Sequence, residues 1–301
     1  MELWIPITIA AALLQCVRTA LQQKLKALLS TNGANFVRYL YGAPVSLAML
    51  GVLLAGGASL PAPHLEFVAM AALGGLAQIV ATSLLIYAFT LRNFAVGTAY
   101  SKTETVQTAL FATLLLAEPL SFWAWIGIAI SLFGVWVLSL RGDSRGLRNV
   151  LFGWTQKSAL VGIAAGTCFA VAAISIRVAS LSLPEGDFVV RAIMTLAVMN
   201  TLQVVMLGAW LAARERDQLV RVVTTWRSSA IVGLLSVFGS ACWALAMTLE
   251  NAAHVRALGQ VELVFTFVAS RYLLKENPVL GEIVGAVLVV SGVVLLLLRG
   301  A

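Results

Sequence analysis

Long apolar runs separated by short polar stretches dominate the chain. A transmembrane helix needs about 20 mostly apolar residues. Windows of that length predict ten spans, at 4–24, 35–55, 66–89, 97–116, 121–140, 159–180, 187–211, 229–250, 255–274 and 279–298. Runs of this length suit helices rather than barrel strands, because a helix satisfies its backbone hydrogen bonds within one segment. We therefore expect an all-α integral membrane protein with ten transmembrane helices.

The second half of the chain repeats the first. Residues 75–142 align without a gap to residues 233–300 at an offset of 158, and a weaker match relates 35–38 to 187–191. The matched pairs include Glu104 with Glu262, Gly127 with Gly285, and Gly134 with Gly292. Each repeat holds five spans, an odd number, so the second enters the membrane from the opposite side. We predict two inverted five-helix repeats, at 1–142 and 159–301, joined by a basic connecting loop at 143–158.

Composition excludes several classes of protein. Hydrophobic residues make up 60% of the chain and charged residues 11%, whereas soluble domains carry about 25% charge. The cysteines Cys16, Cys168 and Cys242 lie in apolar runs without metal-ligand spacing. HExxH, P-loop and nucleophile-elbow motifs are missing from the sequence, as is a nucleic-acid recognition motif. We expect no enzyme activity, no catalytic residues, no metal, no cofactor and no nucleic-acid partner.

Basic residues gather in the loops on one side of the predicted spans. They are Lys24, Lys26, Arg92, Arg141, Arg145, Arg148, Lys157, Arg214, Arg216, Arg221, Arg227 and Lys275. The positive-inside rule places these loops in the cytoplasm and both termini outside.

A short signature recurs near the end of each repeat. The first copy reads Glu118-Pro119-Leu120, then Trp125-Ile126-Gly127 and Gly134-Val135; the second reads Lys275-Glu276-Asn277-Pro278, then Gly285 and Ser291-Gly292-Val293. With ten spans in two repeats, the chain resembles the drug/metabolite transporter superfamily, EamA type. The resemblance implies secondary transport of small metabolites, often export of amino acids, through a central cavity. It also implies cytoplasmic termini, opposite to the charge count, so the orientation stays open.

The fourth span is too polar at its start to face lipid. Ser101, Glu104, Thr105 and Thr108 follow a spacing that forms one helical face, and Tyr100 flanks it. Lys102 precedes Glu104 by two residues, so in a regular helix it projects about 200° away. We expect Lys102 to point into a neighbouring helix interface or to snorkel.

The ninth span carries the repeat copy of this segment, with Arg256, Gln260 and Glu262. Glu104 and Glu262 occupy equivalent depths in opposed halves. Charge within a span is costly and usually faces a cavity or a partner, and desolvation favours the protonated form of a carboxyl group. One hypothesis is that one or both acids exchange protons and couple transport to the proton gradient. The alternative is that they are structural and neutralised by a buried Arg or Lys.

Other candidate ligands lie in the first, third and eighth spans. Gln15 and Arg18 belong to a polar stripe on the first span, where Arg18 is suited to binding a carboxylate or phosphate; pairing with Glu104 or another buried acid is equally favoured. Tyr87 and Trp243 fall near equivalent repeat positions. They are candidates for stacking on a flat or cationic substrate, or for simple packing.

The sequence thus predicts a multi-pass protein of the bacterial cytoplasmic (inner) membrane. We expect a secondary transporter that exports a small polar metabolite, such as an amino acid, by alternating access in exchange for protons. The partners would be the small-molecule substrate, protons and the lipid bilayer, with either a monomer or a homodimer. An organic-cation or organic-anion carrier of the same fold stays open. So does a membrane-embedded enzyme or assembly subunit acting on a lipid-linked substrate.

Overall fold

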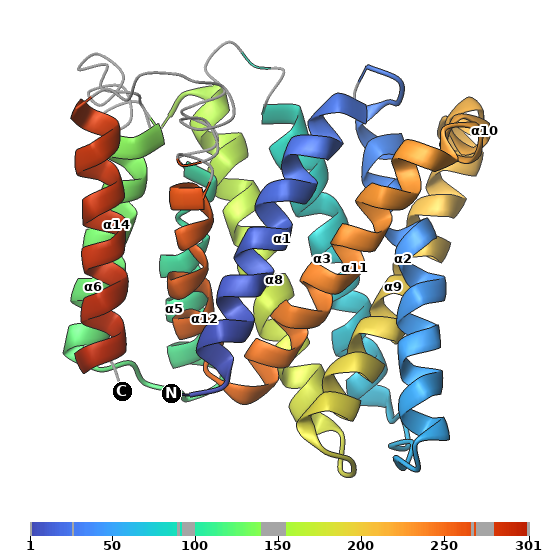
Figure 1. The fold of residues 1–301 in the computed structure, drawn as a ribbon, viewed down its shortest axis with the longest axis horizontal. Coiled ribbons are helices and arrows are strands. Elements are labelled where there is room, and N and C mark those ends of the chain that lie inside the picture. The colour runs from blue at the N-terminus through green and yellow to red at the C-terminus, as the bar shows by residue number, and fades with distance from the viewer. Residues whose placement is uncertain are drawn as a thin grey trace. The chain divides into compact units, whose positions relative to one another are not determined.

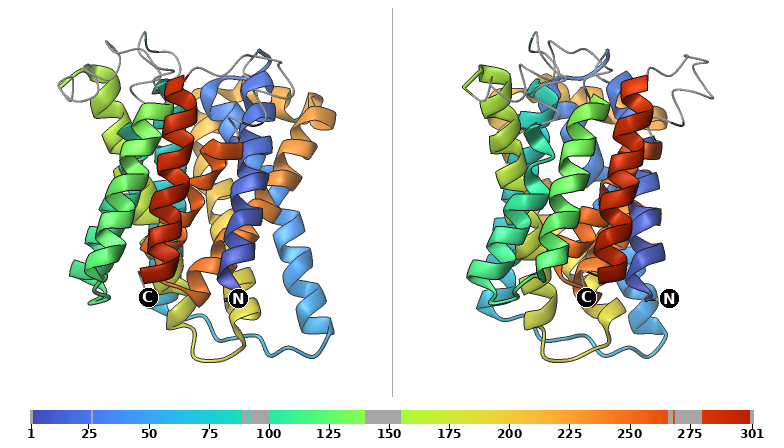
Figure 2. Two further views of the ribbon diagram at one scale, coloured as in Figure 1. Left: turned by 60° about the vertical axis from the view of Figure 1, so that its left-hand side comes forward. Right: turned by 90° about the vertical axis from the view of Figure 1, so that its left-hand side faces the viewer.

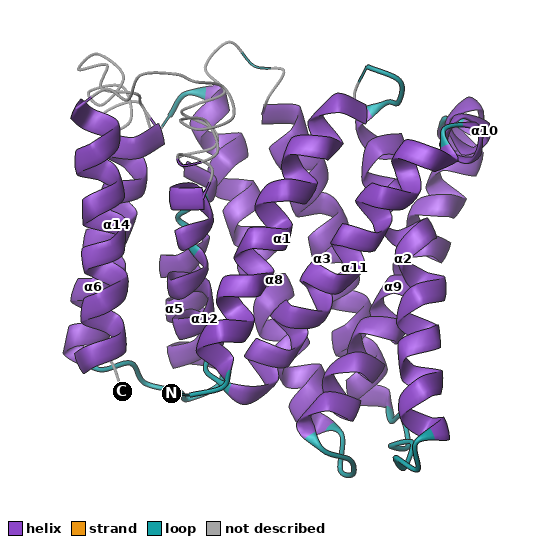
Figure 3. Cartoon of the chain, viewed as in Figure 1, coloured by secondary structure: helices purple, strands orange, loops and turns teal. Residues whose placement is uncertain are grey.

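The structure, a computed structural model, describes residues 2–25, 27–88, 91, 100–139, 155–265, 268 and 280–299. Within these residues all regular secondary structure is helical (Figure 3). Several features named above lie outside the described residues: Lys26, Arg92, Arg141, Arg145, Arg148, Lys275, residues 143–154 of the connecting loop, and the second-copy signature at 275–278.

The helices follow most of the predicted apolar runs closely. They are α1 (Trp4–Leu25), α2 (Thr31–Ala55), α3 (Leu65–Ala88), α5 (Glu104–Leu115), α6 (Phe122–Ser139), α8 (Lys157–Ser182), α9 (Phe188–Arg214), α10 (Arg216–Thr224), α11 (Trp226–Leu249), α12 (Ala252–Gly259) and α14 (Leu280–Arg299) (Figure 1). Of the described helices, α1, α2, α3, α8, α9 and α11 are long and apolar enough to cross a membrane. α6 and α14 contain shorter apolar stretches. The protein is therefore an all-α, multi-pass membrane protein.

Two of the predicted spans differ from a continuous helix. In the fourth, α5 begins only at Glu104, after a turn at Lys102 and Thr103; in the ninth, α12 ends at Gly259 and a turn at Gln260 follows. One helix was not predicted: α10, of nine residues, lies in the connection between α9 and α11.

The chain forms two compact units. Unit 1 comprises residues 1–79 and 171–250, and unit 2 comprises residues 80–170 and 251–301. Each unit therefore combines segments from both halves of the sequence. The boundaries between the units fall within α3 and α8, so each of these two helices contributes residues to both units.

In unit 1, the helices α2 and α9 run antiparallel. The ring of Phe36, near the start of α2, reaches Gly208 near the end of α9, where an added Cβ would lie 3.3 Å from the ring. Further along, Asn200 Nδ2 donates to Ser46 Oγ at 3.3 Å. The weaker repeat match relates the starts of these two helices. Their opposite directions are those that an inverted repeat requires.

In unit 2, the helices α6 and α14 run side by side and antiparallel (Figure 2), and they occupy equivalent repeat positions. A Cβ added at Gly127 would lie 2.7 Å from the carbonyl oxygen of Gly292, and one at Gly134 would lie 2.8 Å from that of Gly285. Gly127 thus lies against Gly292, the repeat partner of Gly134. Gly134 lies against Gly285, the repeat partner of Gly127. Only residues without a side chain allow two backbones this close, so we call this contact the glycine seam.

Candidate functional site

Two interrupted helices form the centre of the candidate site, both in unit 2. The first turn lies at Lys102 and Thr103, and the second at Gln260. The N–H of Thr105 bonds to the carbonyl of Lys102 at 3.4 Å, and the N–H of Leu263 bonds to that of Gln260 at 3.1 Å. At the repeat offset of 158 these are the same bond in both copies. The interruption is therefore a property of the repeat, and such tightened turns within helices often mark functional sites.

Local hydroxyl groups stabilise the first interruption. Thr103 Oγ1 donates to the carbonyl of Tyr100 at 2.6 Å and accepts from Gln107 Nε2 at 2.9 Å. Bonds of this kind compete with regular helix geometry. Helix α8 packs directly against the turn, because a Cβ added at Gly166 would lie 2.8 Å from the carbonyl oxygen of Ser101. The backbone at this turn is therefore covered by protein.

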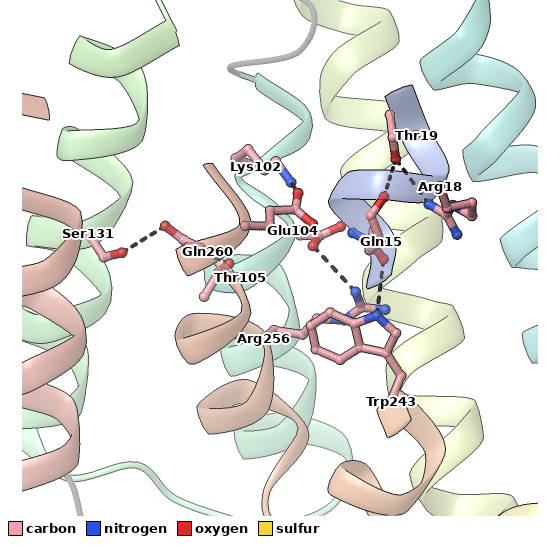
Figure 4. Close-up of polar contacts among 11 residues, drawn as sticks. Gln15, Arg18, Thr19, Lys102, Glu104, Thr105, Ser131, Trp243, Arg256 and Gln260 are labelled. Atoms are coloured by element: carbon pink, nitrogen blue, oxygen red, sulfur yellow. Dashed lines mark hydrogen bonds and ion pairs between the residues drawn. The ribbon is translucent and has the colours of Figure 1, made fainter. Parts of the chain in front are cut away.

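Two ion pairs connect the interrupted helices. Lys102 Nζ forms a hydrogen-bonded ion pair with Glu262 Oε1, and Arg256 Nη1 lies 3.6 Å from Glu104 Oε1. Figure 4 shows Lys102, Glu104 and Arg256 converging from α12 and the start of α5. The four side chains are only 8–14% exposed. Each pair joins one residue of the first half of the sequence to one of the second.

These contacts explain the position of Lys102. The expectation that it projects away from Glu104 assumed a regular helix, whereas Lys102 lies in a turn. It nevertheless reaches a neighbouring element, as expected, because its partner Glu262 follows α12. Both matched acids have a cation as partner in this conformation. Removing one member of such a buried pair costs about 3–5 kcal/mol, because the other charge is left uncompensated.

Gln260 joins three elements of unit 2. Its Nε2 donates to Thr105 Oγ1 at 2.6 Å, and its Oε1 accepts from Ser131 Oγ at 2.8 Å. All three side chains are buried. Gln260 is the repeat partner of Lys102, so one position carries an amide fixed by two hydrogen bonds and the other carries a charge.

Tyr100 and Ser101 precede the first turn and are buried in unit 2. The Tyr100 ring centroid lies 6.2 Å from that of Trp136. Tyr87, also in unit 2, is 40% exposed, with the ammonium of Lys157 5.6 Å from its ring centroid. Tyr87 therefore already has a cation at its ring.

The remaining candidates belong to unit 1. Trp243 Nε1 donates to Gln15 Oε1 at 3.0 Å, joining α11 to α1, and the indole is 8% exposed (Figure 4). Arg18 Nη2 lies 3.4 Å from Thr19 Oγ1, which in turn donates to the carbonyl of Gln15. The structure thus brings Gln15 and Trp243 together, with Arg18 one helical turn along α1.

The sequence analysis did not single out two residues that join helices through side-chain hydrogen bonds, Arg177 and Ser131. Arg177, near the C-terminal end of α8, donates to the carbonyls of Met247 and Glu250 at 2.9 and 2.6 Å. It thereby caps the C-terminus of α11, where a cation complements the helix dipole. An arginine within an apolar span is a signal in itself. Ser131, which binds Gln260, lies in an otherwise apolar helix and gave no comparable signal.

Among the described residues, no group of three His, Cys, Asp or Glu side chains is placed to hold a metal ion. The polar groups that come together are instead charge pairs, hydroxyls and amides. Charged side chains inside membrane spans typically belong to transport or proton pathways. The class that fold and site define is therefore a multi-pass membrane transporter.

Similarity to known proteins agrees with this class. The EamA-like transporter family matches the chain twice, over residues 2–140 and 156–298. The chain therefore belongs to the EamA-like transporter family, within the drug/metabolite transporter superfamily, and its members are transporters rather than enzymes. No curated protein matches the chain. A protein of known crystal structure matches with a TM-score of 0.73 and 16% identity, covering 99% of this chain and 97% of that one. At this identity the likeness concerns the fold alone.

Proposed function

We propose that the protein is a proton-coupled secondary transporter that exports a small zwitterionic metabolite, such as an amino acid, by alternating access. Membership of the EamA-like family supports transport. The coupling ion, the substrate class and the direction are our proposal, and the direction depends on the family resemblance. In this proposal the chain crosses the bacterial inner membrane ten times, and its interrupted helices form the fourth and ninth spans.

The observation that carries the proposal is the presence of two ion pairs in unit 2, Lys102 with Glu262 and Arg256 with Glu104. Protonation of Glu262 would remove the negative partner of Lys102, and protonation of Glu104 would do the same for Arg256. Each cation would then lack a counter-charge in a poorly solvated setting, which is costly. Protonation is therefore opposed while the pairs are intact. The ammonium group of a substrate needs an ionised carboxylate, so it competes with the proton for the same acid, and exchange of substrate for protons requires this competition.

The same charges favour a zwitterion over a singly charged substrate. The two acids and two bases sum to zero, so the site is neutral before binding. A zwitterion adds no net charge, since its ammonium group can face one acid while its carboxylate faces a base. A purely cationic or anionic substrate would add one uncompensated charge, whose burial costs several kcal/mol.

The test uses purified protein reconstituted into liposomes with an imposed pH gradient. Substrate is first selected by thermal shift against amino acids, organic cations and organic acids, because a ligand of the folded state raises its stability. Flux of the selected compound is then measured at several pH values for wild type, Glu104→Gln and Glu262→Gln. The control is Glu66→Gln, an acid whose side chain is 61% exposed.

We expect the pH dependence of flux to disappear in Glu262→Gln, Glu104→Gln or both, and to persist in Glu66→Gln. Unchanged pH dependence in both site variants would remove the coupling proposal. Selective stabilisation by organic cations or anions would replace the zwitterion with that substrate class. Product formation without flux would favour a membrane-embedded enzyme.

A further inference from the structure

The short helix α10 presents an unusual surface on unit 1. It connects the two long helices α9 and α11, and Figure 1 shows it nearly end-on while they run obliquely across the view. One face is buried: Val222 is fully covered, and Gln218 Oε1 accepts from the N–H of Ser30 at 2.8 Å. Tyr41 Oη donates to the carbonyl of Val222 at 3.0 Å. The helix is therefore fixed to unit 1 by specific contacts.

The opposite side of α10 and the start of α11 together combine apolar and cationic side chains. Val220, Val223 and Trp226 are 64%, 59% and 56% exposed. Arg216, Arg221 and Arg227 lie among them and are also exposed. We call these six residues the α10 surface. Exposed valines are costly in water but not at the edge of a bilayer, where tryptophan is also enriched.

The acids near the α10 surface already have partners. Glu215 immediately precedes α10, and its carboxylate accepts from Ser30 Oγ at 2.5 Å and from Asn32 Nδ2 at 3.0 Å. Asp217 pairs with Arg221, with an Nε to Oδ2 distance of 3.3 Å. The connection from 214 to 227 has four arginines against two acids. Its net charge is positive, so it is complementary to an anionic partner.

The geometry points to the α10 surface as a binding site for anionic phospholipid headgroups, with Val220, Val223 and Trp226 entering the headgroup–acyl boundary. The guanidinium group binds phosphate through two parallel hydrogen bonds. An interfacial helix with arginines beside valine and tryptophan has the amphipathic composition that such surfaces require. Because α10 is joined to the start of α2 through Gln218 and Glu215, lipid binding there would stabilise unit 1. This proposal is independent of the transported substrate.

The test measures thermal unfolding of the detergent-solubilised full chain during titration with phosphatidylglycerol, and with phosphatidylcholine for comparison. A second readout is quenching of tryptophan fluorescence by brominated phosphatidylglycerol in wild type and in Trp226→Phe. The key variant is Arg216→Gln with Arg221→Gln and Arg227→Gln. The control is Arg299→Gln, an exposed arginine in the last turn of α14.

We expect phosphatidylglycerol to raise the unfolding midpoint of wild type and phosphatidylcholine to leave it unchanged. Each arginine removed should raise the half-maximal lipid concentration by roughly fivefold, while Arg299→Gln behaves as wild type. Added salt should weaken the effect, since exposed charges are screened. Trp226 should account for a measurable part of the brominated-lipid quenching.

Three results would overturn the proposal. The first is an unchanged phosphatidylglycerol response in the triple variant. The second is equal stabilisation by phosphatidylcholine or by inorganic phosphate, which would indicate a general lipid effect or a simple anion site. The third is identical quenching by brominated phosphatidylglycerol in wild type and Trp226→Phe. This readout does not depend on the triple arginine variant, so it tests the proposal even if that variant fails to fold.

Discussion

The two compact units bury polar groups of different kinds. In unit 1, neutral amides form direct hydrogen bonds: Gln203 Nε2 donates to the carbonyl of Gly75 at 3.1 Å and to Gln78 Oε1 at 2.8 Å, and Asn35 Nδ2 donates to the carbonyl of Ile79 at 3.1 Å. In unit 2, four charged side chains form two ion pairs with little exposure.

This difference separates contacts that change on protonation from contacts that do not. Amide hydrogen bonds do not change with pH in the physiological range, because neither partner ionises. An ion pair with a carboxylate changes when the acid takes up a proton. In the proposed function, the ion pairs of unit 2 therefore respond to protons, whereas the amide hydrogen bonds of unit 1 do not. Unit 1 also contains charged groups, among them the exposed ion pair of Arg221 with Asp217 and the buried Arg38, whose guanidinium lies 5.3 Å from the ring centroid of Tyr39.

The largest predicted effect follows from breaking one ion pair of unit 2. Lys102→Met leaves the buried carboxylate of Glu262 without its cation, so the free energy of unfolding should fall by about 3–5 kcal/mol at neutral pH. Detergent-driven unfolding in mixed micelles measures the change. The double variant Lys102→Met with Glu262→Gln should recover part of the loss, because it removes both charges.

The control for this prediction is Lys24→Met, an exposed lysine in the last turn of α1, with an expected change within about 0.5 kcal/mol. If Lys102→Met were as stable as wild type, the contrast between the buried ion pairs of unit 2 and the amide network of unit 1 would lose its energetic basis.

A second, smaller effect should arise at the glycine seam. A Cβ at Gly292 would lie 2.5 Å from both the carbonyl oxygen of Gly127 and the N–H nitrogen of Ser131, so the helices α6 and α14 would have to separate. Gly292→Val should lower the free energy of unfolding by about 3 kcal/mol. Gly51→Val on α2 is the matched control, since no atom lies within 4 Å of its added Cβ. Equal stability of the two variants would show that the close approach of backbones is not needed.

The smallest effect tests the neutral network of unit 1. Gln203→Leu removes the donor to the buried carbonyl of Gly75 and to the partly buried side chain of Gln78, at a cost of about 2 kcal/mol. The loss should be the same at pH 5 and pH 8, because neither an amide nor a carbonyl ionises in this range. Thr201→Val, an exposed position on the same helix, serves as the control. A pH-dependent loss in Gln203→Leu would contradict the prediction that this amide network does not respond to protons.

Much of this architecture follows from local features of the chain. Apolar runs of about 20 residues determine helices in a bilayer, because the backbone has no other way to satisfy its hydrogen bonds there. The offset of 158 identified Glu104 and Glu262 as equivalent positions, and the polar residues around Lys102 explain why a helix is interrupted there. The glycines of the seam also stand out in sequence, although their partners do not.

The sequence alone determined the helical class, the repeat and the two matched acids. Only the tertiary structure decided that the acids pair with Lys102 and Arg256, that Gln260 is held by Thr105 and Ser131, and that each compact unit combines both halves of the chain. The physical reason is that helices which are apolar on all sides give little indication of their neighbours, because lipid and protein faces are equally apolar. A pair such as Lys102 and Glu262, which are 160 positions apart, therefore becomes visible only when the helices are packed.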